Sequence, residues 1–243
     1  MRVEIPSVPT KNTSVTLIRN WPITLFSIGL FPILVSLGFW QLERAEYKET
    51  IREEIDARLS LQPARPDANL VLRRFTPVSL SGQYTGEYFL LDNRTRSGRA
   101  GYEVLQVFIS ADQRWLINRG WIPLSMNRDV LPKVFYPKNP IKIIGFLYPV
   151  AKKTLNNLSA QEKNRRIQLL DKNLMKKLDL YDASWVIRLS ADSNSALVTD
   201  WNFIKNSAER HRAYSVQWFC MAIALVILWV FAATNFGRLF GYK

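Results

Sequence analysis

Two uncharged apolar runs predict two helices long enough to cross a membrane. The first is WPITLFSIGLFPILVSLGFWQL, residues 21–42, and the second is YSVQWFCMAIALVILWVFAATNF, residues 214–236. At 1.5 Å per residue each helix would extend about 33 Å, enough for the ~30 Å hydrocarbon core of a bilayer. Only helices and closed barrels satisfy their backbone hydrogen bonds in lipid, and both runs are too long for barrel strands. We therefore expect two transmembrane helices.

After the first run, the pattern changes to that of an amphipathic helix. Tyr47, Ile51, Ile55 and Leu59 recur every four residues among charged positions. This spacing places the four apolar side chains on one helical face. We therefore expect the first helix to continue beyond the membrane and to end before Pro63.

From residue 73 the pattern becomes that of β-strands. RFTPVSLSGQYTGEYFLLDN contains short alternating runs interrupted by Gly82 and Gly86. GYEVLQVFI and RWLINRGWIPL are joined by SADQ, which is typical of a hairpin turn. The first of these strands is apolar on both faces and should be central and covered. PIKIIGFLYP and SWVIRLS predict further strands, LDKNLMKKL a short helix with Asp171 as N-cap, and AKKTLNNLSAQEKNRR a mobile loop.

Together these elements predict a membrane α+β protein. Its fold would be two transmembrane helices flanking an outward, mostly antiparallel β domain with a few helices. The expected boundaries are a tail at 1–20, a span at 21–42, the β-rich domain at 43–213, a span at 214–236 and a tail at 237–243.

The two tails are basic. Arg2, Lys11 and Arg19 lie in the first, and Arg238 and Lys243 in the second. Short basic tails favour the cytoplasmic side of a membrane. The predicted β-rich domain would then face the periplasm, or the intermembrane space of a mitochondrion.

The residue counts restrict the chemistry. The chain has 33 Lys and Arg, 20 Asp and Glu, one histidine and one cysteine. Because Cys220 lies inside the second apolar run, no disulfide within the chain and no paired-cysteine metal motif is possible. One histidine excludes the usual zinc sites and a Ser-His-Asp triad in the β-rich domain. The sequence therefore favours a protein that is not an enzyme, with a basic domain suited to anionic ligands or lipid, or only to solubility.

Four local sequences occur in a fixed order. FWQLERAEYK follows the first apolar run, LLDNRTRSGRAGYEVL and WLINRGWIP lie in predicted strands, and HRAYSVQW opens the second run. Together with the two spans, they resemble the Surfeit locus 1 family over about residues 21–236. The resemblance implies an assembly factor for cytochrome c oxidase in the inner membrane of a bacterium, or of a mitochondrion in a eukaryote. The implied partners are oxidase subunit I and haem a synthase, and the implied cofactor is haem a.

The resemblance also implies a role for His211, the only histidine in the chain. It matches a position at the start of the second span where some family members are regarded as binding haem. An imidazole is a good axial ligand for haem iron, and a porphyrin needs apolar, aromatic surroundings. Tyr214 and Trp218 follow His211 at helical spacing, and Trp40 and Gln41 should lie at a similar depth on the first span.

Cationic residues gather near the same position and could pair with haem propionates. They are Arg210, Arg212, Arg44 and Lys48. The alternative is a boundary histidine, with cations that reach lipid headgroups and aromatic residues that belong to an interfacial belt. The corresponding alternative function is a scaffold that stabilises an oxidase assembly intermediate and never binds haem.

One charge lies inside an apolar strand. Arg119 of LINRGWIP would be costly to bury without a partner, and Asp92 of LLDNR is the predicted partner. We expect a buried or half-buried Asp92–Arg119 pair, with Gly120 allowing a close backbone approach. The alternative is an exposed Arg119 that contributes to a partner-binding surface together with Trp121.

Overall fold

The computed structural model describes residues 18–66, 71–125, 130–150, 165–170, 172–204 and 207–235. The chain divides into two compact units, a helical unit of residues 1–51 and 204–243 and a β unit of residues 52–203. Helix α1 runs from Trp21 to Leu59 and α3 from Ala208 to Ala233. The predicted continuation of the first helix into the charged segment is thus confirmed. The tail residues 1–17 and 236–243 lie outside the described residues.

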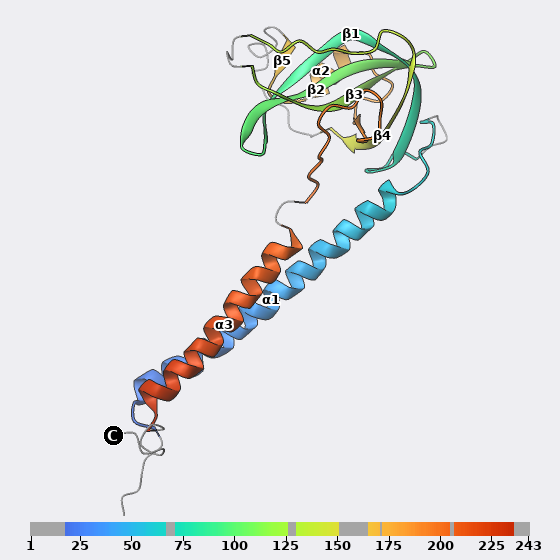
Figure 1. Cartoon of the computed structure of the whole chain (residues 1–243). Helices are drawn as coiled ribbons and strands as arrows, with labels where there is room; N and C mark the ends of the chain where they lie inside the picture. The colour runs from blue at the N-terminus through green and yellow to red at the C-terminus, as the bar shows by residue number, and fades with distance from the viewer. Residues whose placement is uncertain are drawn as a thin grey trace, which may run out of the picture. The chain divides into compact units, whose positions relative to one another are not determined.

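In the helical unit α1 and α3 pack side by side with antiparallel directions (Figure 1). Residues buried between them recur at spacings of three, four, seven and, once, eleven, as in a coiled-coil seam. These residues are Thr24, Ser27, Leu34, Gly38 and Ala45 on α1, and Ala208, Ser215, Ala222 and Ala233 on α3. Most are small, so the backbones approach closely. A Cβ atom on Gly38 would lie 2.6 Å from the ring of Phe219.

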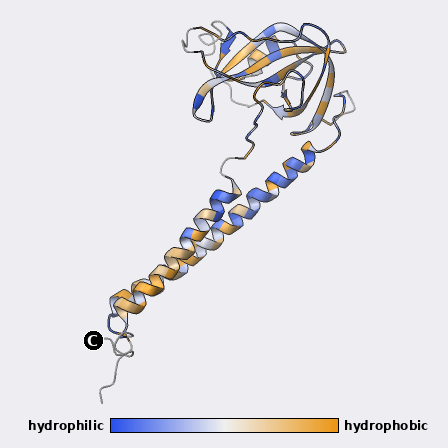
Figure 2. Cartoon of the chain, viewed as in Figure 1, coloured by the Kyte–Doolittle hydropathy of each residue, from blue (hydrophilic) through white to orange (hydrophobic). Residues whose placement is uncertain are grey.

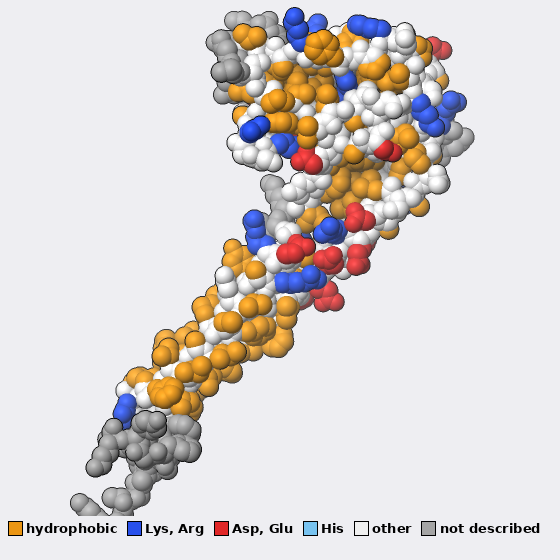
Figure 3. Space-filling view, in the orientation of Figure 1, with side chains coloured by type: hydrophobic (Ala, Val, Ile, Leu, Met, Phe, Trp, Pro, Cys, Tyr) orange, Lys and Arg blue, Asp and Glu red, His pale blue; other side chains and the backbone are white. Residues whose placement is uncertain are grey.

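Away from this seam, the helical unit has an apolar surface. In the most apolar 18-residue stretch of each helix, only 22% of the residues in α1 and 11% of those in α3 are buried. Figure 2 shows hydrophobic residues along most of the helix pair, and Figure 3 shows charged side chains near the end that carries the start of α3. Both helices are long and apolar enough to cross a membrane. Soluble proteins rarely expose so large an apolar surface.

The β unit is built on a sheet that closes on itself. Its elements are β1 (Pro77–Arg96), β2 (Arg99–Ser110), β3 (Gln113–Pro123), β4 (Ile141–Pro149), β5 (Arg166–Ile167), α2 (Lys172–Lys177) and β6 (Trp185–Leu189). The strand order is β2-β3-β6-β4-β1-β5, and β1 also pairs with β2. Five strands therefore form a barrel, and β5 extends it. Of the pairings, β1–β5 and β3–β6 are parallel, so the sheet is mixed and not purely antiparallel.

Strand β1 is continuous where the sequence predicted interruptions. Its residues 77–82 pair with β4 and its residues 83–96 with β2. A Cβ atom at Gly82 would lie 1.9 Å from the carbonyl oxygen of Ile109. Gly82 therefore allows β1 and β2 to approach where the barrel closes, while the strand passes through Gly82 and Gly86 without ending.

Two apolar clusters cover the two faces of the barrel wall. The inner cluster takes residues from all five barrel strands: Val78, Leu80, Tyr84, Phe108, Trp115, Ile117, Ile143, Leu147, Ile187 and Leu189. The outer cluster lies beneath α2 and includes Leu105, Val107, Leu116, Leu174, Met175, Leu178 and Val186. Strand β2 contributes to both clusters, which confirms that it is covered on both faces. The predicted short helix is α2, and its proposed cap Asp171 lies outside the described residues, as do residues 151–164 of the predicted loop.

A β-bulge in β3 redirects the chain within LINRGWIP. The pairing register shifts so that Arg119 and Gly120 together face Val104 of β2. Gly120 has φ +113°, and a Cβ atom there would lie 2.6 Å from the carbonyl oxygen of Val198. The predicted close backbone approach at Gly120 is confirmed.

The bulge places Arg119 inside the barrel, where it is 3% exposed. Its guanidinium donates to Oε1 of Gln106 at 2.9 Å and to the carbonyl oxygen of Ser195 at 3.1 Å, and stacks 5.0 Å from the Tyr84 ring. Burial lowers the pKa of Arg119 and raises that of Tyr84, whose hydroxyl lies 2.6 Å from Oγ of Ser195. The buried charge is thus compensated by neutral oxygens and an aromatic face.

Asp92, the predicted partner of Arg119, is also buried and accepts the N–H of Asn93 at 2.7 Å. Among the described residues, Asp92 is not one of the contacts of Arg119. The guanidinium points into the barrel interior, where Gln106 and Ser195 already supply acceptors.

Gly120→Ala should lower the free energy of unfolding by about 3 kcal/mol, because the new methyl group meets a backbone oxygen at a positive φ. Gly98→Ala is the matched control. Gly98 also has a positive φ, +75°, but a Cβ there meets nothing within 4 Å, so about 1 kcal/mol is expected. Thermal unfolding of the full chain in detergent, followed by circular dichroism, compares the two. Equal losses of unfolding free energy in the two variants would show that the contact with Val198 does not contribute to the effect of Gly120→Ala.

Gln106→Leu should destabilise the protein by about 2–4 kcal/mol, because it removes an acceptor from a buried guanidinium. Adding Arg119→Met to Gln106→Leu should recover part of this loss, since the charge that lacked its acceptor is then gone. The same unfolding measurement gives both values. If the two substitutions destabilise additively, Gln106 and Arg119 are not coupled in this way.

Candidate functional site

His211 lies in the first turn of α3, half-buried, on the side that meets α1. Its Nδ1 atom lies 2.8 Å from Oε1 of Gln41. With Nδ1 as the donor to this amide oxygen, the lone pair lies on Nε2, which is then the nitrogen that could ligate a metal.

The helix pairing explains why these two side chains meet. Gln41 follows Gly38 by three residues, and His211 precedes Ser215 by four, so both continue the seam. The hydrogen bond confirms the prediction that Gln41 lies at the same level as His211. A polar pair in an otherwise small and apolar seam also fixes the register of two helices. The structure therefore supports a packing role for His211.

The predicted aromatic residues differ in how far they are exposed. Tyr214 is 47% exposed and Trp40 50% exposed, whereas Trp218 is half-buried. The face that runs from His211 through Ser215 to Ala222 packs against α1. It is thus occupied by helix packing, and the aromatic side chains exposed near His211 are Tyr214 and Trp40.

The predicted cations differ in their surroundings. Arg212 lies 3.8 Å from Oε2 of Glu49, and Arg44 stacks 5.6 Å from the ring of Tyr47. Arg210 is exposed and Lys48 is half-buried. Arg210 and Arg212 flank His211 on α3, and both are exposed to solvent or to a ligand.

These residues fit a haem held by a single axial ligand. The site offers one imidazole whose ring is oriented by a hydrogen bond at Nδ1, as metal-binding histidines usually are. Exposed aromatic and cationic side chains lie on neighbouring positions. The chain contains no second histidine.

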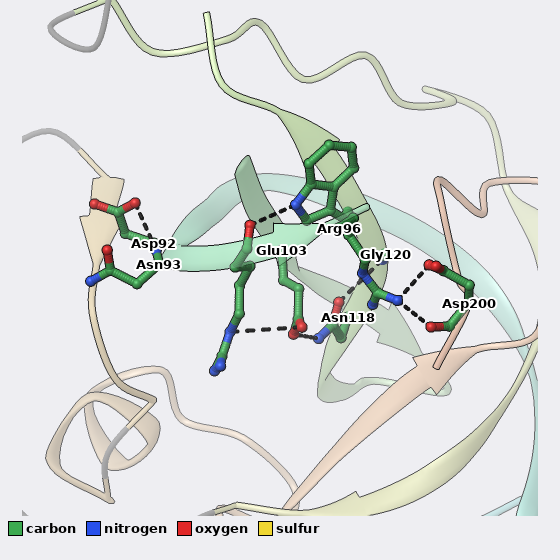
Figure 4. Close-up of polar contacts among 9 residues, drawn as sticks. Asp92, Asn93, Arg96, Glu103, Asn118, Gly120 and Asp200 are labelled. Carbon is green, nitrogen blue, oxygen red and sulfur yellow. Dashed lines mark hydrogen bonds and ion pairs between the residues drawn. The ribbon is translucent and has the colours of Figure 1, made fainter. Parts of the chain in front are cut away.

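The two motifs that lie in strands form one polar cluster on the β unit, drawn in Figure 4. Glu103 is 7% exposed, accepts from Nδ2 of Asn118 at 2.7 Å and lies 3.7 Å from Nε of Arg94. Asn118 also accepts the N–H of Gly120, and the indole of Trp121 donates to the carbonyl oxygen of Arg94. The motifs LLDNRTRSGRAGYEVL and WLINRGWIP are therefore joined by contacts that stabilise the β3 bulge.

Sequence reasoning missed a neighbouring set of side chains around Arg188 on β6. Its guanidinium lies 3.6 Å from the ring centre of Tyr148 and 4.7 Å from that of Trp201. The signal was present, since Arg188 interrupts the apolar strand SWVIRLS as Arg119 interrupts its own strand. Its aromatic neighbours come from segments far apart in the chain and could not be paired with it by pattern.

The chain was also compared with known proteins. The model of the SURF1 family matches residues 28–223. The SURF1-like protein of Rickettsia prowazekii is 27% identical over 230 residues, which cover 86% of this chain and 88% of that protein. The SURF1-like protein of Rickettsia felis is 26% identical over 226 residues, 84% of this chain and 94% of the relative. Because the family model extends from α1 through the barrel into α3, the chain belongs to the SURF1 family.

Proposed function

We propose that this protein is a membrane-anchored assembly factor for cytochrome c oxidase that holds haem a for insertion into subunit I. Membership of the SURF1 family, which is associated with oxidase assembly, supports the general role. The observation that carries the haem-binding role is the hydrogen bond between Nδ1 of His211 and Gln41. With Nδ1 donating to Gln41, Nε2 would be the nitrogen that could hold haem iron.

Each side chain near His211 has a task in this proposal. Gln41 holds the Nδ1 proton and orients the ring, which increases the basicity of the ligating nitrogen. Arg210 and Arg212 neutralise the propionates, and Tyr214, Trp40 and Trp218 shield the apolar edges. Haem a supplies the iron that binds the imidazole. A single protein ligand suits a carrier, because release requires only one bond to break.

The two apolar helices support a membrane location. We propose the inner membrane, with both termini cytoplasmic and the β unit on the outer side. Subunit I of the oxidase would be the client, and haem a synthase the source of haem.

The second candidate function is a scaffold that never binds haem. It is favoured by the seam position of His211, because a histidine hydrogen-bonded to the neighbouring helix can serve packing alone. In that case the helix pair would hold an assembly intermediate of the oxidase. Replacing His211 with an uncharged residue that preserves helix pairing would then preserve oxidase assembly.

The protein purified from cells that make haem a should show a Soret absorption band, and His211→Ala should abolish it. Gln41→Leu should weaken haem affinity by about ten-fold, because the imidazole loses the acceptor that orients it. Gln217→Leu is the matched control, since Gln217 is exposed on α3, and it should leave the band unchanged. Visible titration with haem measures all four proteins.

Oxidase assembly in cells that lack the native protein gives the second measurement. The haem-carrier proposal fails if neither the parent protein nor any variant shows a Soret band while oxidase assembly still depends on the protein. The scaffold function would then remain.

A further inference from the structure

Arginines and aromatic rings alternate on the outer side of the barrel. The guanidinium carbon of Arg74 lies 5.0 Å from the ring centre of Tyr148, and that of Arg188 lies 3.6 Å from the same ring. Arg188 also lies 4.7 Å, and Arg96 5.6 Å, from the ring of Trp201. We call Arg74, Tyr148, Arg188, Trp201 and Arg96 the arginine ladder. Side chains alternate along β6: Ile187 belongs to the inner cluster and Val186 to the outer one, so Arg188 lies on the outer face.

Arg188 lies between Tyr148 and Trp201. Among the residues that the structure describes, it has neither a hydrogen bond nor an ion pair, and its Nε atom is buried without a partner. Burial lowers the pKa of Arg188, and the nearby Arg94 and Arg96 lower it further, whereas Glu103 and Tyr148 oppose the shift. Ring contacts at the faces of a guanidinium leave its edge available. Here the Nη N–H groups are accessible at that edge, while Nε is buried. A held guanidinium with unused donors is arranged to bind a planar anion.

The surroundings of the ladder remain positively charged. Arg96 pairs with Asp200, and Arg94 lies 3.7 Å from Glu103. Arg74 is exposed and donates to the hydroxyl of Tyr148, while Arg188 has no carboxylate within ion-pair distance in the described part of the chain. Four arginines therefore share two carboxylates. This excess favours a ligand that carries more than one negative charge.

An open, mainly apolar pocket of about 250 Å³ adjoins the ladder and shares Trp201 with it. Its lining is Leu59, Pro77, Gly145, Phe146, Ser190, Thr199, Trp201 and Phe203. Pockets for whole cofactors or drug-sized ligands usually measure about 300–1,000 Å³. This pocket is smaller and suits one large apolar side chain.

We propose that the arginine ladder and the adjoining pocket bind an acidic segment of a partner polypeptide. Carboxylates of the segment pair with Arg188 and Arg74, and one apolar side chain enters the pocket beside Trp201. Guanidinium donors pair with carboxylates and phosphates alike, so the adjoining pocket of side-chain size is what favours a polypeptide over a lipid headgroup. The proposal does not depend on His211 or on haem.

The test uses the full-length protein in a neutral detergent and a fluorescein-labelled peptide with one leucine between two pairs of glutamates. A peptide with glutamines in place of the glutamates tests the charge, and one with alanine in place of leucine tests the pocket. Fluorescence anisotropy measures the affinities. The glutamate peptide should bind at least about ten-fold more tightly than the glutamine peptide, and its affinity should fall as salt is added.

Arg188→Gln should weaken binding of the glutamate peptide by about ten-fold or more, because a charge-assisted pair is lost. Lys138→Gln is the matched control, since Lys138 also stacks on a ring, 4.0 Å from that of Tyr136, but is not part of the ladder. It should leave binding within about two-fold. Arg74→Gln removes an exposed ladder residue and tests the site even if Arg188→Gln fails to fold.

Several results would overturn the proposal. One is failure of the glutamate peptide to bind the parent protein. Another is equal weakening by Lys138→Gln and by the ladder variants, which would indicate unspecific attraction to a basic protein. A third is binding to phosphatidylserine vesicles that depends on Arg188 and Arg74 while peptide binding does not. That result would assign the ladder to lipid.

Discussion

The close approach of α1 and α3 is the constraint on which the candidate site depends. Small residues such as Gly38, Ser215 and Ala222 bring the two backbones together, and the ring of Phe219 fills the space that a larger residue at position 38 would need. Only with this spacing can the short amide side chain of Gln41 reach Nδ1 of His211. The chemistry of the lone histidine therefore follows from helix packing. A change that separated the helices would remove the hydrogen bond without altering either residue.

The β unit depends on a different constraint. The closed barrel contains a buried charge, which is costly unless acceptors are supplied. The bulge at Gly120 turns Arg119 inward, and the segment that carries Ser195 and Val198 crosses the bulge to supply acceptors. Val198 also forms backbone hydrogen bonds with Trp121. The crossing segment therefore replaces the hydrogen bonds between strands that the bulge removes from β3. The sequence motif around Arg119 is thus a structural motif, as expected from the sequence, and not the partner-binding surface that was the alternative.

Much of this architecture could be predicted from the sequence because it is encoded locally. The long apolar runs, the continuous apolar run of β2 and the hairpin at residues 110–113 depend on residues close in the chain. The parallel pairing of β3 with β6 and the closure of β1 on β2 depend on long-range contacts that no local period reveals. The same limit explains Arg119. The sequence pattern identified a buried charge and predicted a carboxylate as its partner. The fold instead supplies acceptors from Gln106 and Ser195, which lie far from Arg119 in the chain.

Arg119 and Arg188 show how the same sequence signal can have two physical outcomes. Both are arginines in apolar strands, and desolvation lowers the pKa of each. Arg119 donates to two oxygens and stacks on one ring, so the fold itself accounts for its charge. Arg188 stacks between two rings, and the described residues offer its N–H groups no acceptor. Stacking stabilises a cation but does not replace hydrogen bonds. The fold therefore satisfies the donors of Arg119, whereas those of Arg188 would be satisfied by the proposed anionic partner.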